Sequence, residues 1–368
     1  KKIGHRTRLY YGWESVYNKV GSFSERVHIE TLDTTPNNSR YPNGATWQVH
    51  GVYGNLTYRL NEKWILNGGM RYSYYLVLAD FDTSFFNFPV MEARNRNGAL
   101  NGSLGTVFSP GKKTQIYLNA STGFRAPNVD DIGKVFDSEP GNVVVPNPDL
   151  KPEYAYNAEA GFVTSFSKYL HVDGAVYYTY LKDALVRRNF QLNGQDSIVY
   201  EGDLSQVQAI QNVASAYVYG VQVGIMINLT KGFYVKSQIS YQYGREQSDD
   251  SLKYYPKSHV APLFGRTTLS YQFKKFRADF YAIYNGEMSF DQLPLTERND
   301  SFVYAKDKNG NPYTPAWYTL NLKMIYPINR NLTISGGVEN ITDQLYRTYS
   351  SGISAPGRNL ILSIKAKF

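Results

Sequence analysis

The chain has 368 residues and no cysteine, and its 39 Lys and Arg against 31 Asp and Glu give a formal net charge of +8. The lack of cysteine excludes a disulfide framework, a cysteine-ligated metal site and a thiol nucleophile. No run of about 18 apolar residues is present, which excludes a transmembrane helix within this sequence. Lys and Arg are scattered along the chain without a basic stripe, so no nucleic-acid partner is expected.

Aromatic residues are unusually frequent, with 33 Tyr and 19 Phe beside 30 Gly. Tyr and Phe favour strands, and amphipathic aromatic side chains gather at membrane–water interfaces. The composition therefore favours β-structure of the kind found in an outer membrane.

Apolar and polar residues alternate along much of the chain, which is typical of strands with one apolar and one polar face. The alternation predicts about fourteen strands, many of them longer than the five or six residues usual in soluble domains. They fall at 5–18, 47–60, 63–78, 97–109, 113–124, 153–166, 169–188, 207–229, 232–245, 260–273, 276–289, 316–327, 331–345 and 357–368.

The connections between these strands alternate between short and long. Short turns fall near residues 61–62, 110–112, 167–168, 230–231, 274–275 and 328–330, and long loops near 19–46, 79–96, 125–152, 189–206, 246–259, 290–315 and 346–356. Transmembrane barrels have short periplasmic turns and long extracellular loops. Since every backbone polar group must be paired inside lipid, only a closed barrel can span with strands. The sequence thus predicts an all-β, transmembrane antiparallel barrel.

Three stretches carry a family resemblance. They are GFRAP at 123–127 followed by NPDLKPE at 147–153, the ending GVENITDQLYRTYSSGISAPGRNLILSIKAKF at 337–368, and SRYPNGATW at 39–47. Together they resemble the TonB-dependent outer-membrane receptors, in a form similar to those of Bacteroidetes-type bacteria.

The resemblance implies a 22-stranded barrel with a plug inside it, located in the bacterial outer membrane. Residues 1–368 would then be the C-terminal part of the barrel, with the plug and first strands absent from this chain. It also implies outer-membrane lipid and a TonB-type energy transducer acting through the plug as partners, and it leaves open whether a surface lipoprotein caps the barrel. Phe368 should end on the periplasmic side, where it resembles the signal read by the outer-membrane assembly machinery.

No catalytic constellation is found, so the chain is not expected to be an enzyme. The five histidines form no closely spaced metal pair, and no nucleophile elbow or P-loop is present. No metal and no cofactor are expected. A barrel enzyme or adhesin is a further possible function class, but it would need a set of catalytic residues in the loops at the barrel mouth.

Ligand-binding residues are expected in the long loops. Flat aromatic faces with polar tips suit siderophores, corrins or sugars, which points to Tyr254, Tyr255, Tyr304 and Tyr313. Trp317 fits an interfacial aromatic girdle better.

Arg125 and His259 complete the predicted ligand-binding set, although a loop-orienting role for Arg125 and a surface or capping role for His259 are the stronger expectations. The FRAP and NPDL boxes resemble those flanking a haem-ligating His, yet residues 128–146 contain no His and no Tyr. Haem uptake through this loop is therefore in doubt.

The leading hypothesis is TonB-dependent active import of a scarce, bulky ligand, with a ferric siderophore first and cobalamin, haem or an oligosaccharide open. The alternative is a passive, complete fourteen-stranded channel of porin or fatty-acid-transporter type. The first needs a plug that the energy transducer pulls, whereas the second needs none.

Overall fold

The computed structural model describes residues 1–368 except 83, 85–91, 140, 248–252, 299–302 and 368. Within this part, fourteen strands have eight or more residues, as the alternation predicts. They are β2 (Thr7–Lys19), β5 (Thr46–Arg59), β6 (Trp64–Asp80), β7 (Glu92–Gly111), β8 (Thr114–Arg125), β11 (Glu153–Ser165), β12 (Leu170–Asn189), β14 (Asp203–Asn228), β15 (Phe233–Gln247), β17 (Phe264–Phe273), β18 (Phe276–Asn285), β21 (Trp317–Pro327), β22 (Leu332–Glu339) and β23 (Asn359–Ala366).

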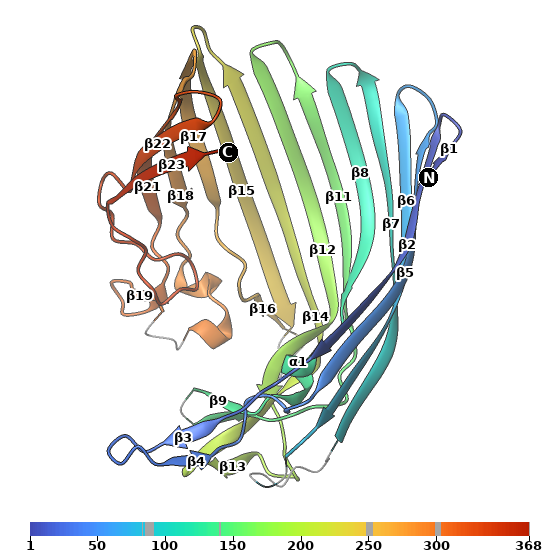
Figure 1. Ribbon diagram of the computed structural model, residues 1–368, viewed down its shortest axis with the longest axis vertical. Coiled ribbons are helices and arrows are strands. Elements are labelled where there is room, and N and C mark those ends of the chain that lie inside the picture. Colours follow the sequence, from blue (N-terminus) through green and yellow to red (C-terminus); the bar gives the residue numbers. More distant parts are fainter. Residues whose placement is uncertain (83, 85–91, 140, 248–252, 299–302, 368) are drawn as a thin grey trace.

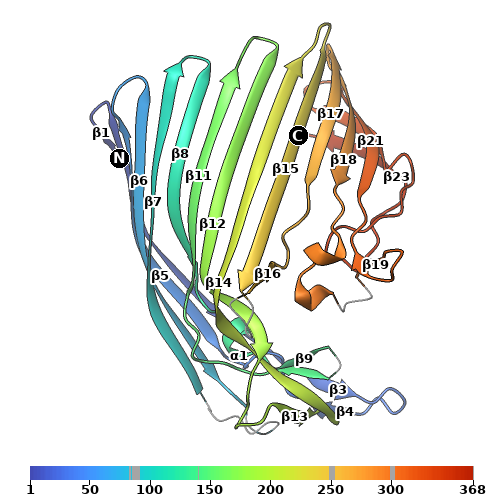
Figure 2. The same ribbon diagram turned by 180° about the vertical axis from the view of Figure 1, so that it is seen from behind.

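The long strands form one curved antiparallel sheet in which each strand pairs with the next long strand along the chain (Figures 1 and 2). Among the described residues no pairing joins β23 to β2, so the sheet is open. The architecture is therefore a partial barrel wall, which confirms the predicted fold class.

Short turns gather at one rim of the wall and long connections at the other (Figure 1). The turns occupy residues 60–63, 112–113, 166–169, 229–232, 274–275 and 328–331. The backbone N–H of Lys367 donates to the Asn331 carbonyl at 2.8 Å, so the end of β23 reaches the short-turn rim. Phe368 itself lies outside the described residues.

The register carries one apolar face across the whole sheet. Leu66 and Gly68 lie on the same face of β6, since they are two residues apart. Gly68 pairs with Leu104 of β7, and Leu104 pairs with Ala120 of β8, so this face continues across the three strands. The same face continues to Tyr178, Phe280 and Leu362, all more than 40% exposed. Since side chains alternate between the faces of a sheet, the other face carries the polar residues.

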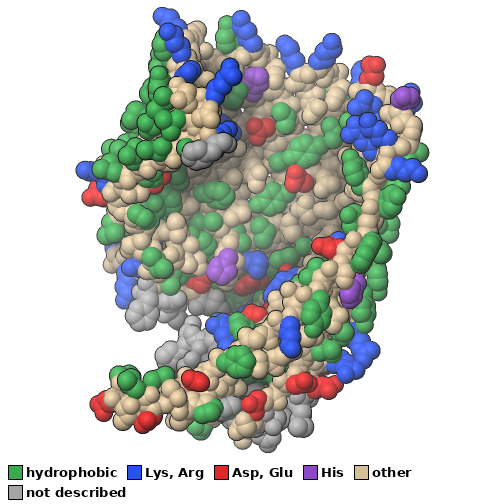
Figure 3. Space-filling model, in the orientation of Figure 1, with side chains coloured by type: hydrophobic (Ala, Val, Ile, Leu, Met, Phe, Trp, Pro, Cys, Tyr) green, Lys and Arg blue, Asp and Glu red, His purple; other side chains and the backbone are tan. Residues whose placement is uncertain are grey.

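The concave face holds charged and polar side chains (Figure 3). Arg71 donates to Glu14 at 2.9 Å, and the Arg277 Nε donates to Asp279 at 3.0 Å. A wall with an apolar outer face and a polar inner face is the pattern of a barrel that encloses water within lipid.

The long-loop rim has its own hydrophobic core. α1 (Val129–Gly133) and β10 (Asn142–Val144) belong to the connection that follows β8, and β13 (Ser197–Tyr200) precedes β14. Val129 and Ile132 of α1 pack with Val77 of β6 and Val207 of β14. No helix in the described ranges combines the length and apolar character needed to cross a membrane.

Two strand boundaries differ from the prediction for a tertiary reason. β14 begins at Asp203, four residues before the predicted start, because its first residues pair with β13 and, in parallel, with β10. β17 begins at Phe264 rather than 260, because β16 (Tyr254–Pro256) occupies the neighbouring edge of β15. Neither partner is visible in local alternation.

Candidate functional site

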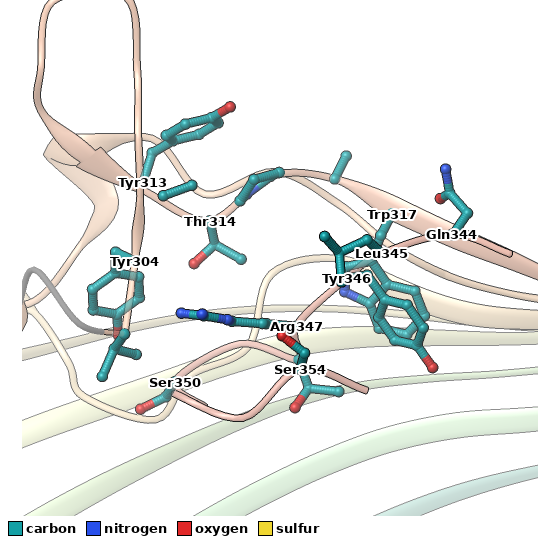
Figure 4. A pocket seen from close by; sticks show the side chains of 15 residues that line it. Tyr304, Tyr313, Thr314, Trp317, Gln344, Leu345, Tyr346, Arg347, Ser350 and Ser354 are labelled. Carbon is teal, nitrogen blue, oxygen red and sulfur yellow. The ribbon is translucent and has the colours of Figure 1, made fainter. Parts of the chain in front are cut away.

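Two long connections at the rim enclose a cavity of about 600 Å³ (Figure 4). The first, residues 286–316, contains η1 (Phe290–Gln292), η2 (Leu295–Glu297), β19 (Ala305–Lys306) and β20 (Pro312–Tyr313). The second, residues 340–358, joins β22 to β23. We call this cavity the loop pocket. It is lined by Val303, Tyr304, Ala305, Tyr313, Thr314, Pro315, Ala316, Trp317, Gln344, Leu345, Tyr346, Arg347, Thr348, Ser350 and Ser354.

The second connection is held at its base by Asn340, whose φ is +47°. Its side-chain oxygen accepts from the Gln344 N–H at 2.9 Å, and its amide donates to the Gln344 carbonyl at 2.8 Å. Asp343 accepts from the Arg358 N–H at 2.7 Å. A Cβ on Gly357 would lie 2.7 Å from the same Asp343 oxygen, so a larger residue there would displace that carboxylate. The hydrogen bonds of Asn340 and Asp343 thus hold both ends of the connection 340–358 at the edge of the sheet.

Glu297 ties the two connections together. The hydroxyls of Tyr304, in the first connection, and Tyr349, in the second, both donate to the Glu297 carboxylate. Tyr304 is 6% exposed and packs with Met288 and Leu293. A carboxylate accepting two hydroxyl protons gives charge-assisted hydrogen bonds, which are stronger than neutral ones.

Burial and the neighbouring Glu297 carboxylate raise the pKa of both tyrosines above the ordinary value of 10.0. Burial is the larger cause in each case, since it disfavours the charged phenolate. Both hydroxyls consequently stay protonated, and remain donors to Glu297, in neutral and moderately alkaline solution.

These raised pKa values predict a stability that falls in alkaline solution. Above pH 10 the unfolded tyrosines release protons while the folded ones retain them, so the unfolded state gains stability as pH rises. Each tyrosine should contribute up to about 1.4 kcal/mol per pH unit until its folded pKa is reached. The melting temperature of the full-length protein should therefore fall less between pH 9 and pH 11 in a Tyr304→Phe/Tyr349→Phe variant than in the wild type. Equal falls would contradict the assignment.

Aromatic rings form one wall of the loop pocket. Trp317, at the start of β21, packs against Tyr346 with ring centroids 4.3 Å apart and the ring planes inclined by 31°. Figure 4 shows Tyr304 and Tyr313 on the opposite side, with Arg347 extending between them and this pair. Within the described residues, the buried Thr314 hydroxyl and Trp317 indole N–H have no hydrogen-bond partner. The pocket therefore suits a flat, ring-bearing ligand with polar substituents.

Two of the six predicted ligand residues, Tyr304 and Tyr313, line the loop pocket, and the other four do not. The His259 Nδ1 lies 3.4 Å from the hydroxyl of the lining residue Ser350. The Tyr254 hydroxyl pairs with Ser215 at 2.7 Å, and Tyr255 lies in β16 opposite Glu246. The ligand role of all six stays a prediction.

Arg125 lies at the end of β8 and pairs with Asp131 of α1 at 2.5 Å. Asp131 also accepts from the Asn128 N–H at 3.1 Å, while the Asn128 side chain accepts from the Asp131 N–H at 3.1 Å, so the helix begins with a reciprocal cap. This contact fits the loop-orienting role expected for Arg125, whose side chain is 46% exposed, and a direct ligand contact stays a prediction.

Sequence reasoning missed Tyr346, Arg347, Tyr349 and Glu297. The first three lie inside the stretch 337–368 that carries the family resemblance. Their signal was the same as for the predicted tyrosines, namely aromatic and charged residues in a long loop. Glu297 had no local signal. No group of three or more His, Asp or Glu in the described ranges could hold a metal ion.

Comparisons with known proteins agree with this architecture. The family model "TonB dependent receptor-like, beta-barrel" matches residues 2–341. Hemoglobin-binding protein A of Haemophilus influenzae is 26% identical over 72% of this chain and 29% of its own length. Transferrin-binding protein A of Neisseria meningitidis serogroup B is 24% identical over 91% of this chain and 38% of its own length. The chain thus spans well under half of these relatives.

Solved structures share the fold over the whole chain. The copper transporter OprC superposes with a TM-score of 0.77 at 17% identity, covering 100% of this chain and 55% of its own. The FrpB iron transporter of Neisseria meningitidis, in its apoprotein form, gives 0.70 at 17% identity, covering 100% and 54%. The chain therefore belongs to the TonB-dependent receptors, and it forms part of their β-barrel in the bacterial outer membrane.

Proposed function

We propose that the protein containing this chain imports an iron-bearing ligand actively across the outer membrane. The observation that carries the proposal is the loop pocket, a partly enclosed aromatic cavity at the long-loop rim of a barrel wall whose inner face is polar. In a barrel of this family the long loops are extracellular. A ligand bound there lies at the mouth of a wetted path.

A ferric siderophore is the first candidate ligand, and haem, cobalamin or an oligosaccharide are the others. The packed Trp317 and Tyr346 rings and the Arg347 side chain suit flat aromatic chelating groups with negative charge. Relatives named for haemoglobin and transferrin binding support an iron-related cargo. The loop at 128–146 offers no His or Tyr for haem.

The remainder of the barrel and its plug are proposed to come from other residues of a longer protein. The edge strands β2 and β23 support this, because they do not pair with each other, only the first residues of β2 pair with residues 2–3 on its outer edge, and open strand edges are not tolerated in lipid. A TonB-type energy transducer would act on that plug, and a surface lipoprotein could cap the long loops. Import then follows from a plug state with lower affinity for the ligand.

Uptake of radiolabelled ferric siderophores by cells that express the full-length receptor tests the proposal. We expect accumulation above the external concentration, and its loss when the energy transducer is deleted. The matched control is the same strain with an empty vector. Accumulation that survives deletion of the transducer would overturn active import.

The alternative, a passive fourteen-stranded channel, makes the opposite prediction. In liposomes it would pass small solutes down their gradient without a partner protein. The open sheet and the family match argue against a passive channel. Rapid solute flux through the purified full-length protein would instead support the channel hypothesis.

A further inference from the structure

Every short turn of the wall carries a cation. The six turns hold Lys63, Lys112, Lys113, Lys168, Lys231, Lys274, Lys275 and Arg330, against the single carboxylate Glu62. We call these eight residues the basic collar. Figure 3 shows lysine and arginine side chains gathered along this rim.

The opposite rim has the opposite charge. The described residues of the seven long connections, within 20–45, 81–91, 126–152, 190–202, 248–263, 286–316 and 340–358, contain 16 Asp and Glu and 11 Lys and Arg, a net charge of −5. The short turns carry +7, from eight cations and one carboxylate, so the two rims are polarised. A chain with a net charge of +8 spread evenly would show no such contrast.

The collar cations are accessible to a binding partner. All eight are exposed, and none takes part in an ion pair with the described residues. Lys168 and Lys274 lie over the rings of Tyr169 and Phe273, at 4.9 and 5.4 Å from the ring centroids. These cations therefore sit directly beside aromatic side chains.

Aromatic residues form a band just inside the collar on the apolar face. Trp64 stacks on Phe108 at 4.4 Å, and Phe233 contacts Tyr271 at 4.5 Å. Phe166 is 66% exposed. Such bands mark the level of the lipid headgroups. In five of the six turns a collar cation lies one to four residues from one of these aromatic residues. Cations so close to an interfacial aromatic band are expected at the level of the headgroup phosphates.

We infer that the basic collar binds anionic phospholipid headgroups of the periplasmic leaflet. The lysine ammoniums contact phosphates while the neighbouring aromatic rings anchor in the interface, an arrangement that attracts negatively charged lipids. A soluble acidic partner would not require the rings of Tyr169 and Phe273 beside Lys168 and Lys274. Binding of this kind would also fix the depth and tilt of the barrel.

Lipid selectivity of the purified full-length receptor tests the inference. The receptor in detergent is mixed with equal amounts of phosphatidylglycerol and phosphatidylethanolamine of identical acyl chains, and the bound lipids are counted by native mass spectrometry. The test variant is K112Q/K113Q/K274Q/K275Q. The control variant K19Q/K151Q/K306Q/K308Q removes the same charge from the long-loop side.

We expect the wild type and the control variant to prefer phosphatidylglycerol, and the collar variant to lose at least about tenfold of that preference. The preference of the wild type should also weaken as salt screens the contact. An unchanged preference in the collar variant, or an equal loss in the control, would overturn the inference. So would a collar variant with normal lipid selectivity but weakened binding to peptidoglycan sacculi, which would assign the collar to the cell wall. Normal heat-modifiable migration of each variant in gels verifies that it is folded.

Discussion

Replacing Gly232 by alanine should destabilise the barrel by about 3 kcal/mol or more. Gly232 ends the turn between β14 and β15 with φ at +85°, and an added Cβ would lie 2.2 Å from the backbone oxygen of Gln272. An L-residue is strained at that φ, and the clash is with backbone, which cannot rotate away. Its carbonyl also accepts from the Gln272 N–H at 2.9 Å, a bond that any shift would break.

Gly54→Ala is the matched control for this prediction. Gly54 lies in β5, and no atom is within 4 Å of its added Cβ. The change should therefore stay within about 1 kcal/mol, since alanine is better tolerated than glycine in a strand. Urea unfolding of the full-length receptor in lipid, followed by heat-modifiable migration, measures both. A Gly232→Ala receptor as stable as the Gly54→Ala receptor would contradict the role of this turn.

The strands could be predicted from the sequence because a membrane wall imposes a local rule. Lipid on one side and water on the other force alternation along every strand, and the pattern in 360–367 alone identifies β23. The alternation of short and long connections then predicts which strand ends lie at the same rim. The predicted bounds differ where a strand met an unforeseen partner, as β14 does with β10, and also at ordinary strand ends, since β7 begins at Glu92 rather than 97 and β22 ends at Glu339 rather than 345.

The site could be predicted only in part, because its geometry depends on distant contacts. Tyr304 and Tyr313 were found as loop aromatics, whereas the bond between Tyr349 and Glu297 spans 52 residues and has no local signature. Arg125 differs from these residues, because it belongs to a motif that resembles the family and its hydrogen-bond partner, Asp131, is only six positions away in sequence.

The basic collar was missed for a geometric reason. Its cations are separated in sequence by whole hairpins, so the distribution looks scattered. Antiparallel pairing returns the chain to the same rim after every second strand, which turns scattered cations into a band. Charge patterning in a barrel therefore has to be read by rim rather than along the chain.

Replacing Tyr346 by leucine should lower the affinity of the receptor for its cargo by about tenfold. The ring packs against Trp317 in the wall of the loop pocket. Leucine keeps an apolar side chain but removes the flat face on which an aromatic ligand packs. Quenching of intrinsic fluorescence by a ferric siderophore measures the affinity of the full-length receptor. Phe108→Leu is the control, because Phe108 stacks on Trp64 with similar geometry, at 4.4 Å, but outside the pocket. The control should bind the siderophore as tightly as the wild type does. Equal affinities of the Tyr346→Leu and Phe108→Leu receptors would show that the loop pocket does not bind the ligand.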